Sequence, residues 1–123
     1  MHINTNSETP IFIQIAQQIE DSIFTGVFEE ESKIPSTNEM SILLNINPHT
    51  VLKGMNILVE EHILYKKRGL GMFVKTGAVQ QIKEKRQHLF YSQYIETMIN
   101  EAKKLNMTKQ EIMSLIERGY QDE

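Results

Sequence analysis

The stretch IPSTNEMSILLNINPHTVLKGMNILVE, residues 34–60, contains start signals for two consecutive helices. Ser36 followed by Glu39 matches a capping box, in which the serine hydroxyl binds the amide of the third helical residue and the carboxylate binds back to the serine amide. Asn47 followed by Pro48 matches a cap and the first position of a second helix. Because only about three residues separate the two helices, they have the dimensions of a helix-turn-helix. By geometry alone, an ordinary helical hairpin stays open as the alternative.

Both helices carry apolar residues at helical spacing. The first contains Met40, Leu43 and Leu44, and the second is expected to turn Val51, Leu52, Met55, Leu58 and Val59 inward.

The flanking segments extend this pattern. Residues 10–25, PIFIQIAQQIEDSIFT, repeat isoleucine every four residues, which predicts an amphipathic helix with Pro10 at its first position and Gly26 as a left-handed cap. Residues 63–75, ILYKKRGLGMFVK, indicate two short strands joined by a glycine-containing turn. Three helices followed by a hairpin are the order of a winged helix, so we expect a mainly α fold with a small β-hairpin.

The remaining residues, 77–123, predict one amphipathic helix through about Leu105 and a last helix opened by a second capping box, Thr108 with Glu111. Two such helices have too little core to stand alone, so their apolar positions need a partner, and we expect that partner to be a second copy. These positions include Ile82 and Leu105, and the residues assigned to dimerisation are Leu89, Phe90, Tyr94, Ile95, Met98 and Ile99. The expected division is therefore a winged-helix domain at 1–76 and a helical dimerisation segment at 77–123.

The 123-residue chain has an uneven charge distribution beneath a net charge of −3. Residues 1–61 hold two lysines against nine acidic residues, whereas residues 62–88 hold seven basic residues against one glutamate. A basic block of this kind can bind an anion despite the acidic total. With 40% hydrophobic and 24% charged residues the chain is expected to fold. It contains no cysteine, and it has no apolar run long enough to be a signal peptide or a membrane span. We therefore expect a cytoplasmic protein.

In a winged helix the third helix enters the major groove of DNA, and its first residues face base edges and phosphates. Its polar residues here are Asn47, His49, Thr50 and Lys53. The serine hydroxyl at the start of the second helix suits a phosphate oxygen, and arginine at a wing tip suits a narrow minor groove. The wing and the second helix therefore add Ser36, Asn38, Lys66, Lys67, Arg68, Gly69 and Gly71 to the candidate DNA-binding residues.

Residues 10–75 resemble the DNA-binding domain of the GntR family of bacterial transcription regulators. The resemblance rests on four motifs in order: PIFIQIAQQI (10–19), KIPSTNEM (33–40), NPHTVLKGMNIL (47–58) and RGLGMFVK (68–75). The start of the third helix and the tail motif EAKKLNMTKQEIMSLI (101–116) resemble the YtrA subfamily. That resemblance implies a homodimer held by the tail, no large effector-binding domain, and often control of a neighbouring transporter operon.

Three positions depart from the family pattern. Asn38 stands where an arginine is common, Met72 replaces the wing threonine, and the turn EEES (29–32) lacks the usual Pro-Gly. We expect these departures to change affinity and site preference while leaving the fold intact.

The favoured interpretation is a homodimeric, sequence-specific regulator, a repressor acting on double-stranded DNA at an inverted repeat, with recognition helices about 34 Å apart. The competing interpretation is a protein-interaction module, supported by the acidic residues 29–31 and by the loss of arginine at Asn38. In the favoured interpretation the acidic residues 29–31 are a solvated run. A third is a sensor with a ligand pocket around Phe90 and Tyr94. The four histidines (His2, His49, His62 and His88) lack the spacing of a metal site, so we expect no bound metal. We also expect no catalysis and no cofactor. The sequence does not indicate which small molecule, if any, acts as an effector.

Overall fold

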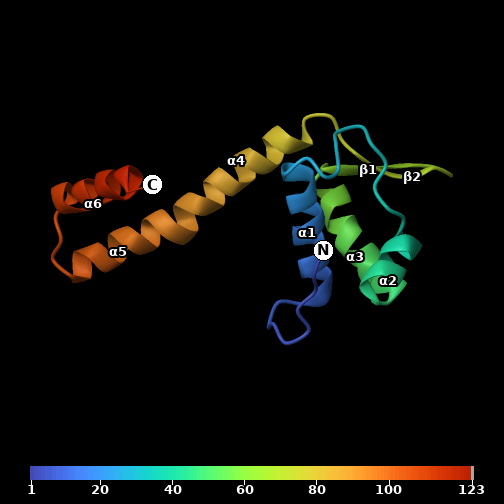
Figure 1. Cartoon of the computed structure of the whole chain (residues 1–123), viewed down its shortest axis with the longest axis horizontal. Coiled ribbons are helices and arrows are strands. Elements are labelled where there is room, and N and C mark those ends of the chain that lie inside the picture. The colour runs from blue at the N-terminus through green and yellow to red at the C-terminus, as the bar shows by residue number, and fades with distance from the viewer. Residues whose placement is uncertain (123) are drawn as a thin grey trace. The chain divides into compact units, whose positions relative to one another are not determined.

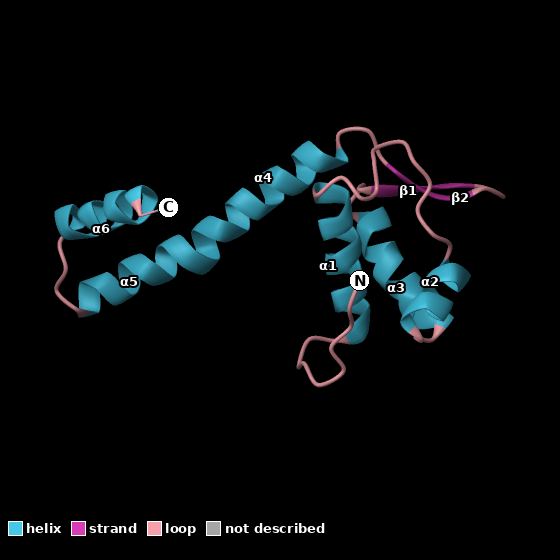
Figure 2. Cartoon of the chain, in the orientation of Figure 1, coloured by secondary structure: helices cyan, strands magenta, loops and turns pink. Residues whose placement is uncertain are grey.

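The computed structural model describes residues 1–122 and contains six α-helices, one π-helical segment and a two-stranded hairpin (Figures 1 and 2). The elements are α1 (Ile11–Phe24), α2 (Thr37–Leu44), α3 (Pro48–Glu60), β1 (Leu64–Lys67), β2 (Gly71–Val74), α4 (Ala78–Phe90), η1 (Tyr91–Ile95), α5 (Glu96–Lys104) and α6 (Lys109–Gln121). The chain divides into two compact units, Met1–Glu84 and Lys85–Glu123. The first unit has the expected winged-helix order.

The predicted helix starts at Ser36 and Asn47 are confirmed. The Ser36 hydroxyl accepts a hydrogen bond from the Glu39 amide at 3.1 Å, and the Glu39 carboxylate accepts one from the Ser36 amide at 3.0 Å. The Asn47 side chain accepts a hydrogen bond from the His49 amide at 2.8 Å. Between the two helices, Asn45 adopts a left-handed conformation with φ of 53°. Helix α1 starts one residue later than predicted, because Pro10 is its cap and Ile11 its first residue.

Helices α1 and α3 pack side by side and form the centre of the first unit (Figure 1). They lie very close together at Gly54, where an added Cβ would lie 2.7 Å from the carbonyl oxygen of Phe12. The core also takes residues from α2, the hairpin and the start of α4. Its fully buried members include Ile15, Ile19, Ile23, Ile34, Met40, Val51, Met55, Leu58, Ile63, Leu64, Val74 and Ile82.

One expectation about an apolar residue changes in this core. Ile82 is buried against the winged helix, so it has no need of the second copy that the sequence analysis assigned to it. The first compact unit consequently runs past residue 76 into α4. On α2, Leu43 is 76% exposed, because only Met40 and Leu44 of that helix face the core.

The wing is an antiparallel hairpin in which Tyr65 pairs with Phe73 and Lys66 pairs with Met72. A third segment, which the sequence did not predict, runs along β2. The Glu31 amide donates to the Val74 carbonyl at 2.8 Å, and the Ile34 amide donates to the Met72 carbonyl at 3.0 Å. The hairpin is therefore anchored to the chain that leads into α2.

The acidic residues 29–31 are all exposed, as predicted for a solvated run, and two of them also make hydrogen bonds within the chain that the sequence did not predict. The Glu30 carboxylate accepts hydrogen bonds from the amides of Gly77 (2.9 Å) and Val79 (3.0 Å) at the start of α4. The Glu31 carboxylate accepts one from the Tyr65 hydroxyl at 2.8 Å. These bonds lower the pKa of Glu30 and raise the pKa of Tyr65, since each favours the protonation state that the bond requires.

We expect Glu30→Gln to lower the melting temperature at pH 7, because a neutral amide interacts less favourably with the positive end of the α4 dipole than a carboxylate does. A carboxyl whose pKa is lowered by folding stabilises the protein above its ordinary pKa of 4.5, and this contribution is lost as the pH falls below that value. The difference from wild type should therefore stay nearly constant from pH 7 to about pH 5 and shrink as the pH falls below 4.5. Glu29→Gln is the control, and an equal effect of both variants at pH 7 would contradict the prediction.

In the second unit, the helix expected through Leu105 ends at Lys104, and it contains the π-helical segment η1. The second capping box is confirmed, since the Glu111 amide donates to the Thr108 hydroxyl at 3.1 Å and the Thr108 amide donates to the Glu111 carboxylate at 3.2 Å. Helices α5 and α6 are joined by a tight turn and lie side by side (Figure 1). None of the helices in residues 1–122 combines the length and apolar character needed to cross a membrane.

Candidate nucleic-acid interface

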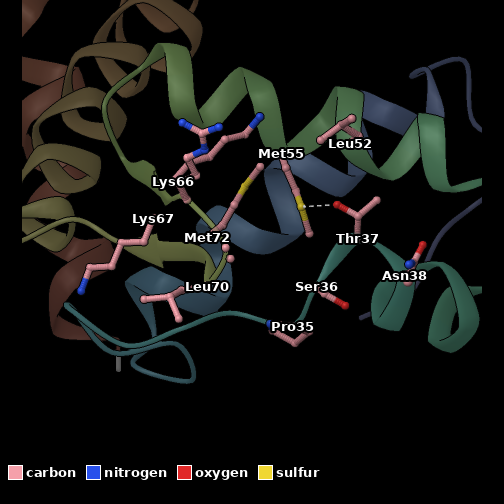
Figure 3. A pocket seen from close by; sticks show the side chains of 13 residues that line it. Pro35, Ser36, Thr37, Asn38, Leu52, Met55, Lys66, Lys67, Leu70 and Met72 are labelled. Atoms are coloured by element: carbon pink, nitrogen blue, oxygen red, sulfur yellow. Dashed lines mark hydrogen bonds between the residues drawn. The ribbon is translucent and has the colours of Figure 1, made fainter.

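An open hollow of about 400 Å³ lies between the start of α2, helix α3 and the wing (Figure 3). Its floor is apolar and contains Leu52, Met55 and Met72. Its rim is polar and basic. The complete lining consists of Pro35, Ser36, Thr37, Asn38, Leu52, Met55, Lys66, Lys67, Arg68, Gly69, Leu70, Gly71 and Met72.

The start of α2 contributes three consecutive polar side chains to this hollow: Ser36, Thr37 and Asn38. The amides at a helix N-terminus point outward and favour an anion there. The Thr37 hydroxyl donates to the Met55 sulfur at 3.5 Å, which ties α2 to α3 (Figure 3). Thr37 was missed by the sequence analysis, although its place directly after the capping serine was the available signal. Asn38 is exposed at the rim.

The wing presents its two lysines on opposite faces. Lys66 pairs with Met72, which lies in the floor of the hollow, so the Lys66 side chain is on the hollow side of the hairpin. The Lys67 ammonium lies 4.4 Å from the Phe73 ring centroid and 5.8 Å from that of Tyr65, on the other face. Figure 3 shows the two lysine side chains pointing away from each other.

The tip of the wing is the turn Arg68–Leu70, closed by a hydrogen bond from the Leu70 amide to the Lys67 carbonyl at 2.9 Å. Gly69 has a φ of 77°, and a Cβ added there would meet no atom within 4 Å, so the tip is open for close approach. Gly71 has a φ of 121°, and a Cβ there would lie 2.9 Å from Lys33 Cε. Both glycines are therefore required by the backbone, and the tip carries Arg68 at an exposed position.

The candidate residues on α3 lie outside the lining of this hollow. Asn47 is exposed and caps the helix, while His49 is exposed and Thr50 is half-buried in the first turn. The Lys53 ammonium lies 4.0 Å from the Phe12 ring centroid, in a cation–π contact with α1. The structure thus gathers the candidates of the α2 start and the wing at one site and holds Lys53 apart from it; the gathered candidates are Ser36, Asn38, Lys66, Lys67, Arg68, Gly69 and Gly71.

The candidate dimerisation residues all belong to the second unit and none of them is buried. Leu89, Phe90, Tyr94 and Ile99 are exposed, whereas Ile95 and Met98 are half-buried. The rings of Phe90 and Tyr94 lie 5.4 Å apart between their centroids. In residues 1–122 no three His, Asp or Glu side chains cluster in a way that could hold a metal ion.

The sequence profile of the bacterial regulatory proteins of the gntR family matches residues 13–74, half of the chain. The chain belongs to the GntR family. It is therefore a GntR-family transcriptional regulator with a winged-helix domain, and its relatives are regulators rather than enzymes.

Two Bacillus subtilis relatives of this GntR chain differ in length. This chain is 37% identical over 102 residues to the uncharacterized HTH-type transcriptional regulator YurK, and the match covers 83% of this chain but only 40% of YurK. It is 27% identical over 129 residues to the HTH-type transcriptional repressor YtrA, with 100% of this chain and 99% of YtrA covered. The chain is therefore YtrA-like in extent as well as in sequence.

Solved structures agree with this assignment. A GntR-family regulator from Bacteroides thetaiotaomicron superposes with a TM-score of 0.79 at 31% identity, covering 91% of this chain and 97% of the other. The DNA-binding domain AraR(DBD), in complex with operator ORE1, superposes with a TM-score of 0.53 at 30% identity, covering 60% of this chain and 93% of the other. Domains of the GntR type thus bind DNA.

Proposed function

We propose that this regulator is a repressor that binds an inverted-repeat operator as a homodimer. The observation that carries the proposal is the hollow in which the α2 N-terminus meets the basic wing. Helix N-termini and exposed Lys and Arg side chains are the groups that bind DNA phosphates. Among the lining residues, all of which lie in the described part of the chain, there is no carboxylate to oppose a phosphate.

Within this proposal the residues divide by role. Ser36, Lys66 and Arg68 bind phosphates or enter the minor groove, with Gly69 and Gly71 allowing close approach. Asn38, Asn47, His49, Thr50 and Lys53 are placed at the major groove, and Lys53 has to leave the Phe12 ring to reach a base. An asparagine can make two hydrogen bonds to adenine, and a lysine can bind guanine.

The exposed apolar residues of the second unit support the homodimer, because a monomer rarely exposes a large contiguous apolar surface. The dimer interface is proposed to contain Leu89, Phe90, Tyr94, Ile95, Met98 and Ile99. The alternative of a protein-interaction module has lost its main support, because Glu30 and Glu31 make intramolecular hydrogen bonds. The resemblance of residues 101–116 to the YtrA subfamily implies a neighbouring transporter operon as the target, and the proposed compartment is the cytoplasm.

Selection from a randomised duplex library with the purified full chain, near physiological salt, tests this function. We expect enrichment of an inverted repeat whose half-sites are one helical turn, about 34 Å, apart. Repeating the selection with His49→Ala and with Lys53→Ala identifies which of the two reads a base, because a base-reading variant relaxes the preference at one position. A folded protein that enriches no sequence would overturn the proposal.

A further inference from the structure

A second concave site lies in the other unit, in the groove between α5 and α6. It has a volume of about 410 Å³, within the range of small-molecule sites of roughly 300–1,000 Å³. Its lining residues come from α5, from α6 and from the turn between them. Figure 2 shows the two helices and the turn that joins them. The lining residues are Met98, Ile99, Ala102, Lys103, Met107, Thr108, Lys109, Ile112 and Met113.

The shape of this groove follows from the local backbone. The Met107 amide donates to the Ala102 carbonyl at 2.9 Å, and Asn106 has a left-handed φ of 56°, so the turn is closed tightly. The Thr108–Glu111 capping box then fixes the first residue of α6. Ala102, which is 8% exposed, leaves room between the helices where a larger side chain would fill it.

Apolar side chains make up most of the groove wall. Three of them are methionines, Met98, Met107 and Met113, whose unbranched and polarizable side chains adapt to irregular apolar ligands.

The charges at the rim are of one sign. Lys103 comes from α5 and Lys109 from α6, and no acidic residue lines this groove in the described chain. The hollow on the other side of the same helix pair is bordered instead by Glu101 and by no lysine. The capping box engages the Thr108 and Glu111 amides at the start of α6, and the two ammonium groups are the charged side chains that an anion would meet at the rim.

We propose that this groove binds a small amphipathic carboxylate, with its apolar chain along the methionines and its carboxylate between Lys103 and Lys109. A neutral apolar ligand would leave both ammonium groups without a counter-charge, and a cationic one would be repelled by them. Met98 and Ile99 line this groove and also belong to the proposed dimer interface, so a second copy of the chain is the competing occupant, and the experiment separates the two.

Calorimetric titration of the full chain with decanoate, below its micelle concentration, provides the test. We expect saturable binding that is weakened about tenfold or more by Lys103→Glu and by Lys109→Glu, the loss typical of a charge-assisted contact. Lys104→Glu is the matched control, because Lys104 is adjacent and exposed but lines neither groove. Decyltrimethylammonium, with the same chain and the opposite charge, should not bind.

Three results would overturn the proposal: no saturable decanoate binding, equal weakening by Lys104→Glu, or equal binding of the cationic amphiphile. The first is also what a groove covered by a second copy would give. Circular dichroism of each variant confirms that it is folded. No DNA enters this experiment, so its outcome is independent of whether the operator proposal holds.

Discussion

Gly54→Ala is expected to lower the free energy of unfolding by about 1–3 kcal/mol, the usual cost of overpacking a core. The added Cβ would lie 2.7 Å from the Phe12 carbonyl oxygen and 2.9 Å from Ile15 Cγ2. The closest atom belongs to the backbone of α1, so the contact can be relieved only by moving one helix away from the other. The higher helix propensity of alanine offsets at most about 1 kcal/mol of this loss in the free energy of unfolding.

Thermal unfolding measures this effect. A domain of 60–100 residues loses roughly 4–8 °C for each kcal/mol, so a fall of about 10 °C is expected for the Met1–Glu84 unit. Gly119→Ala is the matched control, because Gly119 also lies in a helix and an added Cβ there meets no atom within 4 Å. A melting temperature for Gly54→Ala at or above that of wild type would show that α1 and α3 are not packed this closely.

Local sequence signals predicted the helix starts of the winged helix because their causes are local. Ser36 binds Glu39 three residues away, and Asn47 binds the amide two residues away. The glycines of the wing were expected to lie in a turn, and both have positive φ. For such features the residues that form the contact are also neighbours in the sequence.

Contacts between distant segments could not be predicted in this way. The Glu30 carboxylate accepts hydrogen bonds from amides that lie 47 and 49 residues further along the chain, so these bonds could not be predicted from the acidic run itself. The position of Lys53 over Phe12 depends on how α1 packs on α3.

The missing Pro-Gly before Lys33 has a local consequence. Glu31 adopts the left-handed region with φ of 64°, a conformation that glycine would occupy at lower energetic cost.

The opposite orientations of Lys66 and Lys67 could have been predicted, since successive side chains of a strand point to opposite faces.

We expect Lys66→Glu to weaken operator binding about 100-fold or more, because it removes a cation beside the hollow and places an anion there. Lys67→Glu carries the same change in net charge but alters a side chain that lies over Phe73 on the other face. Lys67 also borders the hollow, but its ammonium is directed to the Phe73 ring, so Lys67→Glu should weaken binding only a few fold, less than Lys66→Glu does.

Affinity measured over a series of salt concentrations distinguishes local contact from overall charge. Each phosphate contact contributes about 0.9 to the slope of log K against log salt, so Lys66→Glu should reduce the slope by about 1 or more while Lys67→Glu leaves it nearly unchanged. Both variants should melt close to wild type, because both lysines are exposed. Equal losses of affinity and equal slopes for the two variants would mean that DNA responds only to the net charge of the wing. In that case the hollow between the wing and α2 would not be the surface that receives the phosphate backbone.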